Sequence, residues 1–486
     1  MLFNSYTFLG IFLPIVLAGW WLVLRQPVHR FGFLLLASYV FYSMWEFPQG
    51  LMLLPLLVGA TSVDYVSGRL IHSSSDERFR RRVLWTALGI NLSILGTFKY
   101  YGFFSGIIGA AVSFVSSSGI EVPVRDLILP IGISFYTFIS MSYTIDVYRG
   151  HVRPARSYVE YAAFVSLFPH LIAGPIVRFR EVRSQLGHLP ARLDPRLAAL
   201  GIFFLVVGLF KKVVVAGSLA PHVDRLWAAH EELTMVSAWM ATLAYAFQIY
   251  FDFSAYSEMA VGLALLLGLR FPQNFNSPYK ADSMADFWKR WHITLSRWLR
   301  DYLYIPLGGS RGGRWLTLRN LFLTMLLGGL WHGAGAVFLL WGLGHGAAVV
   351  VHRFCRDRGW TPRSTRINRA LTFGTVVFLM VPFRSGELSI LQAGESFTTM
   401  WSVYASMFGA NGLGLADLSL ASTLGTSVPL SLVALVTGLL VFVNVAPNTW
   451  EFRLRPRRHH AVMVSAMGIW SVLLLSEPTP FLYFQF

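Results

Sequence analysis

The chain has 486 residues, of which 55% are hydrophobic and 13% are charged, and its formal net charge at pH 7 is +16. Soluble domains carry about 25% charged residues, so this composition excludes an ordinary soluble protein and predicts one that resides in the lipid bilayer. A strongly basic chain could also bind nucleic acid, and the distribution of the charge decides between the two.

Most Lys and Arg residues gather in short windows separated by apolar segments. Thirty-four of the forty lie in seven windows, which are 25–30, 69–82, 149–156, 178–196, 270–319, 353–369 and 453–458. Basic clusters that alternate with apolar spans are typical of membrane proteins whose basic loops remain in the cytoplasm. The pattern therefore argues against a nucleic-acid partner.

The first apolar segment, Thr7 to Leu24, has no basic residue before it, which predicts a retained helix with its N-terminus outside the cytoplasm. Since all basic windows are expected on one side, an even number of spans must lie between consecutive windows. The expected spans of this half are 31–47, 51–66, one that starts at 84, and 127–143. The segment 158–177 lies between two basic windows and contains Pro169 and Pro175, so we expect a broken or re-entrant hairpin there.

In the second half, the apolar segments 199–215 and 236–269 lead to the window 270–319, which is expected to be cytoplasmic or interfacial. A compact hairpin is predicted over 320–352, with glycines at its bend. Three further spans are expected near 370–383, 427–445 and 462–475, with an external stretch from 385 to 426. The sequence therefore predicts an all-α polytopic membrane protein, one domain over 1–486, with about 11 to 13 membrane helices including re-entrant segments.

One histidine lies deep in the predicted hairpin. His332 follows Arg319 by thirteen residues, which at 1.5 Å per helical residue places it about 20 Å from the cytoplasmic boundary. A neutral imidazole there could take the proton of an acceptor hydroxyl as it attacks an acyl carbonyl, and flanking glycines would let a substrate approach. Alternatively, the histidine hydrogen-bonds between helices and the glycines serve close helix packing. From the residues alone both interpretations stay open.

The segment from Asp286 to Arg300 has apolar residues at helical spacing and basic residues on the opposite face. It is expected to form an amphipathic helix at the cytoplasmic interface, with its tryptophans at headgroup level and with His292 pointing into the protein. Its cations are candidates for binding an anionic donor, such as the phosphates of a coenzyme A thioester. These candidates are Lys289, Arg290, Arg297 and Arg300.

Other charged residues in the apolar segments are expected to be structural. Asp252 is predicted to pair with a cation, for which Lys211 and Lys212 are candidates, rather than to act as a second base. No nucleotide-binding loop, zinc-protease helix or dinucleotide motif is present, which argues against an ATP-driven pump, a metalloprotease and a redox enzyme. Nothing implies a bound metal or a permanently bound cofactor, and the single cysteine, Cys355, rules out an intramolecular disulfide.

Longer motifs occur in a fixed order along nearly the whole chain. They include Phe12-Leu13-Pro14, Leu129-Pro130-Ile131-Gly132, Phe168-Pro169-His170, Phe251-Asp252-Phe253-Ser254, Trp291-His292 and Gly329-Leu330-Trp331-His332-Gly333. In these motifs the sequence resembles the membrane-bound O-acyltransferase family, and most of all the bacterial branch that contains the membrane subunit of alginate O-acetyltransferase and related cellulose acetylation proteins.

The resemblance implies that the histidine matching His332 is the catalytic residue in a tunnel through the membrane, and that His292 is a second important histidine towards the cytoplasm. It implies transfer of an acetyl group from a cytosolic thioester, acetyl-CoA, to an extracytoplasmic acceptor for O-acetylation of an exported polysaccharide such as alginate or cellulose. The implied location is the bacterial inner membrane, with both termini periplasmic. The implied partners are periplasmic acetyltransferase subunits and an exopolysaccharide biosynthesis complex.

The sequence departs from the family pattern at four positions, and these departures bear on substrate identity rather than on the two histidines. They are Ala255, Glu258, Lys289 and Arg297. Two other functions stay open. One is D-alanyl transfer to teichoic acid, performed by a sibling branch of the family, and the other is a transporter or export subunit whose buried ionisable groups line a solute pathway.

Overall fold

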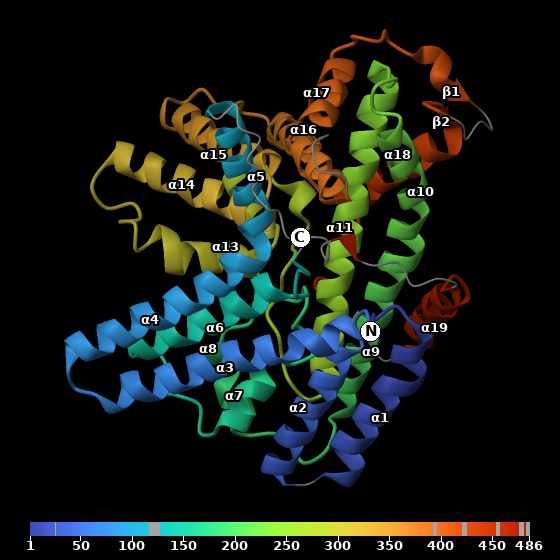
Figure 1. Cartoon of the computed structure of the whole chain (residues 1–486). Coiled ribbons are helices and arrows are strands. Elements are labelled where there is room, and N and C mark those ends of the chain that lie inside the picture. The colour runs from blue at the N-terminus through green and yellow to red at the C-terminus, as the bar shows by residue number, and fades with distance from the viewer. Residues whose placement is uncertain are drawn as a thin grey trace. The chain divides into compact units, whose positions relative to one another are not determined.

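The computed structural model describes residues 1–24, 26–115, 127–391, 396–419, 425–452, 457–475 and 481–482, which are almost entirely helical (Figure 1). The predicted all-α class is confirmed. Three described helical runs are long and apolar enough to cross a membrane, namely Gln49–Ser73, Pro195–Ala228 and Ala336–Asp357. The chain forms two compact units, which are described separately below. The first contains Met1–Leu205 and Ser257–Pro272, and the second contains Val206–Tyr256 and Gln273–Leu474.

The first unit begins with a continuous helical run from Phe8 to Val23, formed by η1, α1 and η2. Its other helices are α2 (Pro27–Ser43), α3 (Gln49–Ser73), α4 (Glu77–Leu95), η3 (Gly96–Tyr100), α5 (Tyr101–Val115), α6 (Ile133–Tyr148), α7 (Tyr158–Val165), α8 (Phe179–Leu186) and the first part of α9 (Pro195–Phe210). Short polar caps set several of these boundaries. The Asp76 side chain, for example, accepts a hydrogen bond from the Arg78 amide at 2.9 Å and so starts α4.

The segment 158–177 is broken, as predicted. Helix α7 ends at Val165, and turns follow until α8 begins at Phe179. The broken part is fixed by Phe168, whose ring lies 5.3 Å from Phe12 and 5.7 Å from Phe41, centroid to centroid. Two motifs that lie more than 150 residues apart in the sequence therefore meet in one buried aromatic cluster.

A buried carboxylate joins three helices of this unit. Asp64 of α3 has no exposed surface, and it accepts hydrogen bonds from Thr144 of α6 at 2.5 Å and from Asn91 of α4 at 2.9 Å. A buried polar group is tolerated when its hydrogen bonds are made. These contacts agree with the structural role predicted for charged residues in the apolar segments, of which Asp64 is one.

The second unit begins within the helical run 195–228, in which η4 (Lys211–Ala216) and α10 (Gly217–Ala228) follow α9. Its other helices are α11 (Met235–Leu266, of which residues up to Tyr256 belong here), η5 (Pro278–Lys280), α12 (Met284–Arg290), α13 (Ile293–Leu299), η6 (Arg300–Tyr304), α14 (Arg314–His332), α15 (Ala336–Asp357), α16 (Thr365–Leu391), α17 (Ser396–Met407), η7 (Leu415–Asp417), α18 (Leu430–Val445) and α19 (Arg458–Leu473). Two parallel strands, β1 (Leu418–Ser419) and β2 (Val428–Pro429), complete its described part.

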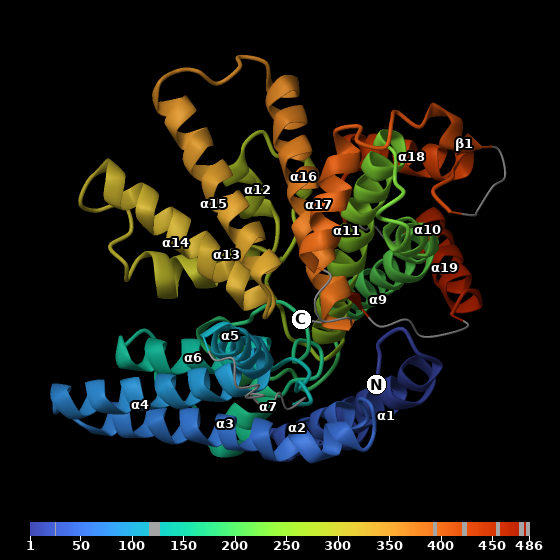
Figure 2. The ribbon, with the colours of Figure 1, turned by 45° about the horizontal axis from the view of Figure 1, so that its top comes forward.

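The predicted hairpin over 320–352 is present as α14 and α15, which lie side by side (Figure 2). Glycines on both helices make the close contact possible. A Cβ atom at Gly329 would lie 2.5 Å from the Phe338 carbonyl oxygen, and one at Gly342 would lie 2.7 Å from the Met325 carbonyl oxygen. Small residues let helix backbones approach in this way.

Two predicted elements differ from the structure. The segment 286–300 is not one amphipathic helix, because α12 ends at Arg290 and a new helix, α13, begins at Ile293. The predicted span near 370–383 continues as α16 to Leu391, so Ser385 belongs to a buried helix face and not to an external stretch.

Candidate active site

His332 is the last residue of α14 and has only 3% of its surface exposed. Aromatic rings surround it: its imidazole centroid lies 4.8 Å from Trp341 and 5.4 Å from Phe383, both nearly perpendicular. The bend after His332 is tightly packed: a Cβ atom at Gly333 would lie 2.2 Å from the Phe338 ring, so only a residue without a side chain fits there. The imidazole is therefore packed in the protein interior, as the sequence predicted.

The glycines around His332 are used for packing. Gly329 and Gly333 face Phe338, and a Cβ atom at Gly328 would lie 3.3 Å from Leu299. Of the two interpretations given to these glycines, close helix packing therefore accounts for all three. The position of the imidazole depends on them, since larger side chains would separate α14 from α15.

His292 lies between α12 and α13 and is completely buried. Its backbone is left-handed, with φ of +43°, a conformation that is uncommon for residues other than glycine. This turn breaks the helical pattern and directs the imidazole inward, where it lies 4.8 Å from the Phe253 ring. The prediction that His292 points into the protein is confirmed.

One amide orients the His292 ring. The Asn274 Oδ1 atom lies 3.1 Å from His292 Nδ1 and also accepts hydrogen bonds from the Thr294 amide and hydroxyl, at 3.2 and 2.9 Å. Because a backbone amide can only donate, this Asn274 atom is the oxygen, so His292 Nδ1 carries the proton and donates to it. The neutral ring then presents Nε2 as its basic nitrogen. Burial lowers the pKa of His292 to about 3, which keeps the ring neutral at physiological pH.

Trp331 connects the two histidines. Its ring centroid lies 5.0 Å from the His332 ring and 6.2 Å from the His292 ring. The structure thus brings both predicted catalytic residues to one indole side chain, although the sequence separates them by forty residues.

A third histidine extends the cluster and was not predicted from the sequence. His345 of α15 is completely buried, and its ring lies 4.6 Å from Trp341 and 5.1 Å from Trp288. Within the described residues, neither nitrogen of His345 and neither of these two indole N–H groups has a hydrogen-bond partner. The only signal in the sequence was the helical spacing of Trp341 and His345, four residues apart, which is equally typical of an ordinary core position.

The four candidate donor-binding cations fall into two pairs. Arg290 is bound to Asp286 at 2.7 Å and Arg300 to Asp301 at 2.6 Å. Lys289 and Arg297 are exposed, and in the part of the chain that the structure describes no carboxylate pairs with either. The structure therefore leaves two of the four cations without an internal counter-charge.

The predicted partner of Asp252 is correct. The Lys212 ammonium forms an ion pair with Asp252, and the other carboxylate oxygen accepts a hydrogen bond from the Leu482 amide at 2.9 Å. Both side chains are buried. Asp252 therefore ties η4 and the end of the chain to α11.

A second buried ion pair was missed. Arg384 of α16 binds Glu387 at 2.9 Å and Asp224 of α10 at 2.6 Å. It follows Phe383, which contacts His332. The pairing of charges three residues apart on one helix explains why a charged stretch that looked external is buried in the structure.

Comparison with known proteins gives the family. The family model described as "MBOAT, membrane-bound O-acyltransferase family" matches residues 127–381, which include both predicted catalytic histidines. The chain belongs to the membrane-bound O-acyltransferase family.

Several relatives cover most of the chain. A protein of Azotobacter vinelandii described as a probable alginate O-acetylase, AlgI, is 42% identical over 92% of this chain and 84% of its own length. The corresponding Pseudomonas putida protein is 38% identical over the full length of both chains. A peptidoglycan O-acetyltransferase of Helicobacter pylori is 37% identical over 86% of this chain and 82% of its own.

Membership in this family makes the chain a membrane-bound O-acyltransferase, which uses an acyl donor. The alternative of D-alanyl transfer has weaker support: a teichoic acid D-alanyltransferase of Bacillus subtilis is 26% identical over 54% of this chain and 71% of its own length. Family membership likewise favours acyl transfer over the alternative of a transporter or export subunit.

Proposed function

We propose that this membrane-bound O-acyltransferase transfers an acetyl group from cytosolic acetyl-CoA across the bacterial inner membrane, for O-acetylation of an exported polysaccharide such as alginate or cellulose. The observation that carries the proposal is the buried His332 imidazole at the end of α14, enclosed by Trp341 and Phe383 and connected to His292 through Trp331. The names of the relatives that cover most of the chain support the acetyl group and the polysaccharide.

His332 acts as the general base in this proposal. Its nitrogen takes the proton of the acceptor hydroxyl while the hydroxyl oxygen attacks the thioester carbonyl carbon, the carbon–sulfur bond breaks, and the coenzyme A thiolate takes the proton back from the imidazolium. The products are the acetyl ester and free coenzyme A. The surrounding rings exclude water, which would otherwise compete with the acceptor hydroxyl.

His292 and the basic residues serve the donor. His292 Nδ1 is occupied by Asn274, so Nε2 is the nitrogen that would contact the thioester arm. Lys289 and Arg297 bind donor phosphates directly, while Arg290 and Arg300 would exchange their Asp286 and Asp301 partners for phosphate. Periplasmic acetyltransferase subunits of an exopolysaccharide complex then receive the acetyl group, and both chain termini lie on their side of the membrane.

The proposal is tested by His332→Ala in the bacterium that makes the protein. We expect the acetyl content of the exported polysaccharide to fall by about a hundredfold or more, with the protein still present in the membrane. The matched control is His459→Ala, which removes an exposed histidine of α19 and should leave acetylation unchanged. Normal acetylation in the His332→Ala strain would rule out the catalytic role.

A further inference from the structure

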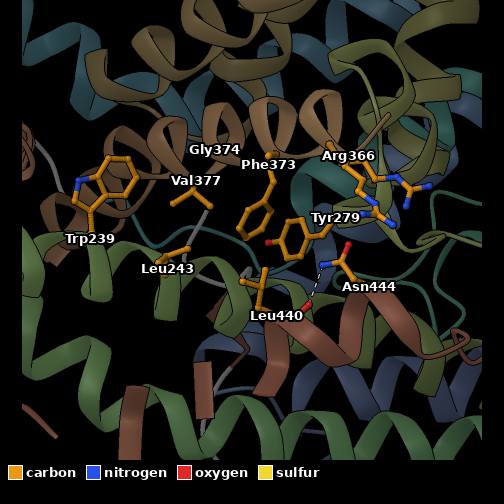
Figure 3. Close-up of a pocket in the computed structure, with 11 residues that line it drawn as sticks. Trp239, Leu243, Tyr279, Arg366, Phe373, Gly374, Val377, Leu440 and Asn444 are labelled. Carbon is orange, nitrogen blue, oxygen red and sulfur yellow. Dashed lines mark hydrogen bonds between the residues drawn. The ribbon is translucent and has the colours of Figure 1, made fainter. Parts of the chain in front are cut away.

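A groove of about 470 Å³ in the second unit lies between α11, α16 and α18, and its lining contains none of the three buried histidines His292, His332 and His345. Its wall is apolar along most of its length, formed by Trp239, Leu243, Phe373, Val377 and Leu440. Figure 3 shows that the polar groups gather at one end, where Arg366 and Asn444 lie, while Trp239 lies at the other. The groove therefore has the amphipathic layout of a lipid, with a charged end and an apolar body.

The charged end carries two arginines that the rest of the described structure leaves uncompensated. Arg366 and Arg369 both line the groove, and both are exposed. No carboxylate within the described ranges forms an ion pair with either one. Guanidinium groups suit bidentate contacts to phosphate oxygens, so the pair favours an anionic occupant.

The apolar body continues from these arginines along the same helix face. Arg366, Arg369, Phe373 and Val377 follow one another at intervals of three or four residues on α16, which places them on one face. From Arg366 to Val377 the helix rises about 16 Å at 1.5 Å per residue. That length allows one acyl chain to run along the groove while its phosphate stays with the arginines.

The wall formed by α18 also has its polar group, Asn444, at the end of the groove where the arginines lie. Asn444 lies in the last turn of α18 and donates to the Leu440 carbonyl at 2.8 Å, so its own side-chain oxygen can accept a hydrogen bond from a headgroup hydroxyl. The Lys280 ammonium donates to the Ala446 carbonyl at 2.7 Å and holds this end of α18. Arg366 and Arg369 belong to the basic window 353–369, which the positive-inside rule places at the cytoplasmic surface.

We propose that the groove binds one anionic glycerophospholipid of the cytoplasmic leaflet. The phosphate contacts Arg366 and Arg369, and one acyl chain packs against Phe373, Val377 and Leu440. Basic pockets between transmembrane helices on the cytoplasmic side are a known means of binding anionic lipid headgroups. This site is independent of the proposed acyl transfer, because it uses none of the residues assigned to that reaction.

The bound lipid would support the wall behind it. The Phe373 ring lies 5.1 Å from Tyr279, and the Tyr279 ring stacks on Trp291 at 6.3 Å. The Tyr279 hydroxyl donates to the Ala246 carbonyl of α11 at 2.5 Å. Trp291 is the residue before His292, so an occupied groove packs against the layer from which the His292 turn begins.

Two variants test the charged end and the apolar body of the groove separately. Arg366→Gln with Arg369→Gln removes the phosphate contacts. Gly374→Leu places an apolar side chain in the groove, where a Cβ atom at Gly374 meets no atom within 4 Å. The matched control is Arg358→Gln with Arg363→Gln, which removes two exposed charges from the same basic window but does not touch the groove.

The measurement is native mass spectrometry of the full-length protein released from nanodiscs of equal phosphatidylglycerol and phosphatidylethanolamine content. We expect the wild-type protein and the control to retain one phosphatidylglycerol in preference to phosphatidylethanolamine. Each groove variant should retain it at least tenfold less.

Three results would overturn the proposal. Equal retention of phosphatidylglycerol by the double-glutamine variant and the wild type would show that the two arginines do not bind the lipid phosphate. Displacement of the lipid by acetyl-CoA would assign the groove to the donor. A dimer signal abolished by Gly374→Leu would assign it to a second copy of the chain.

Discussion

The left-handed backbone at His292 shows how one residue sets the geometry of the candidate site. It ends α12, starts α13 and turns the imidazole inward, where Asn274 fixes which nitrogen is protonated. A periodic pattern cannot reveal such a turn, because the apolar spacing from Phe287 to Leu299 continues across the break. The burial of His292 was predictable, but its orientation depends on Asn274, eighteen residues earlier in the chain.

Asn274 is therefore expected to act as a positioning residue. Replacing it by Ala removes the acceptor of three hydrogen bonds, and we expect kcat to fall about ten- to a hundredfold because the ring loses its fixed tautomer and orientation. Asn274→Asp keeps an acceptor oxygen and should recover most of the activity. Steady-state kinetics with acetyl-CoA measures both variants. An equal loss of activity in Asn274→Ala and Asn274→Asp would contradict the positioning role.

Among the secondary-structure elements, buried ion pairs join helices of the second unit. One of these pairs was predicted from the sequence and the other was not. The sequence offered Lys211 and Lys212 as partners of Asp252 because all three are charges at or within apolar spans, and the structure pairs Lys212 with Asp252. Glu387 lies in the stretch from 385 to 426 that the sequence predicted to be external, and Arg384 directly precedes that stretch. The structure places them inside α16, where they compensate each other.

The Lys212–Asp252 pair gives a stability prediction. Lys212→Met leaves a buried carboxylate without its counter-charge, and we expect the free energy of unfolding to fall by about 3–5 kcal/mol. Adding Asp252→Asn removes the stranded charge and should restore much of the loss. Thermal unfolding in detergent measures both, and a double variant no more stable than the single one would argue against a direct pairing.

The close packing of α14 against α15 gives a second stability prediction. Gly342→Ala places a methyl group 2.7 Å from the Met325 carbonyl oxygen, so the helices must separate. We expect a loss of about 1–3 kcal/mol in stability and lower acyl transfer, since His332 ends α14. Gly438→Ala of α18, where a Cβ atom meets open space, is the control and should change neither property.

At the scale of the whole molecule, composition and the alternation of basic windows were sufficient to predict an all-α membrane protein, because burial in lipid requires helices whose backbone groups are satisfied internally. The boundaries of individual spans were less predictable, since several helices continue into basic windows. Helix α3, for example, includes Arg69 and ends at Ser73. Charge marks the side of the membrane more reliably than it marks the end of a helix.

The orientation can be tested with the single native cysteine. Cys355 lies half-buried at the end of α15 in the basic window 353–369, so a membrane-impermeant maleimide should label it in inverted vesicles and not in intact spheroplasts. In a Cys355→Ser background, Thr7→Cys, at an exposed N-terminal position, should show the opposite pattern. Labelling of both sites from the same side would contradict the proposed topology.

A sided assay can show whether the acetyl group passes through the membrane by way of His332. Purified protein is placed in vesicles with its basic loops outward. The polysaccharide and the periplasmic acetyltransferase subunits are enclosed in the vesicles, and acetyl-CoA that carries a label in its acetyl group is added outside. We predict label on the enclosed polysaccharide and free coenzyme A outside with the wild-type protein, and neither with His332→Ala. Equal label on the enclosed polysaccharide with both proteins would contradict the mechanism.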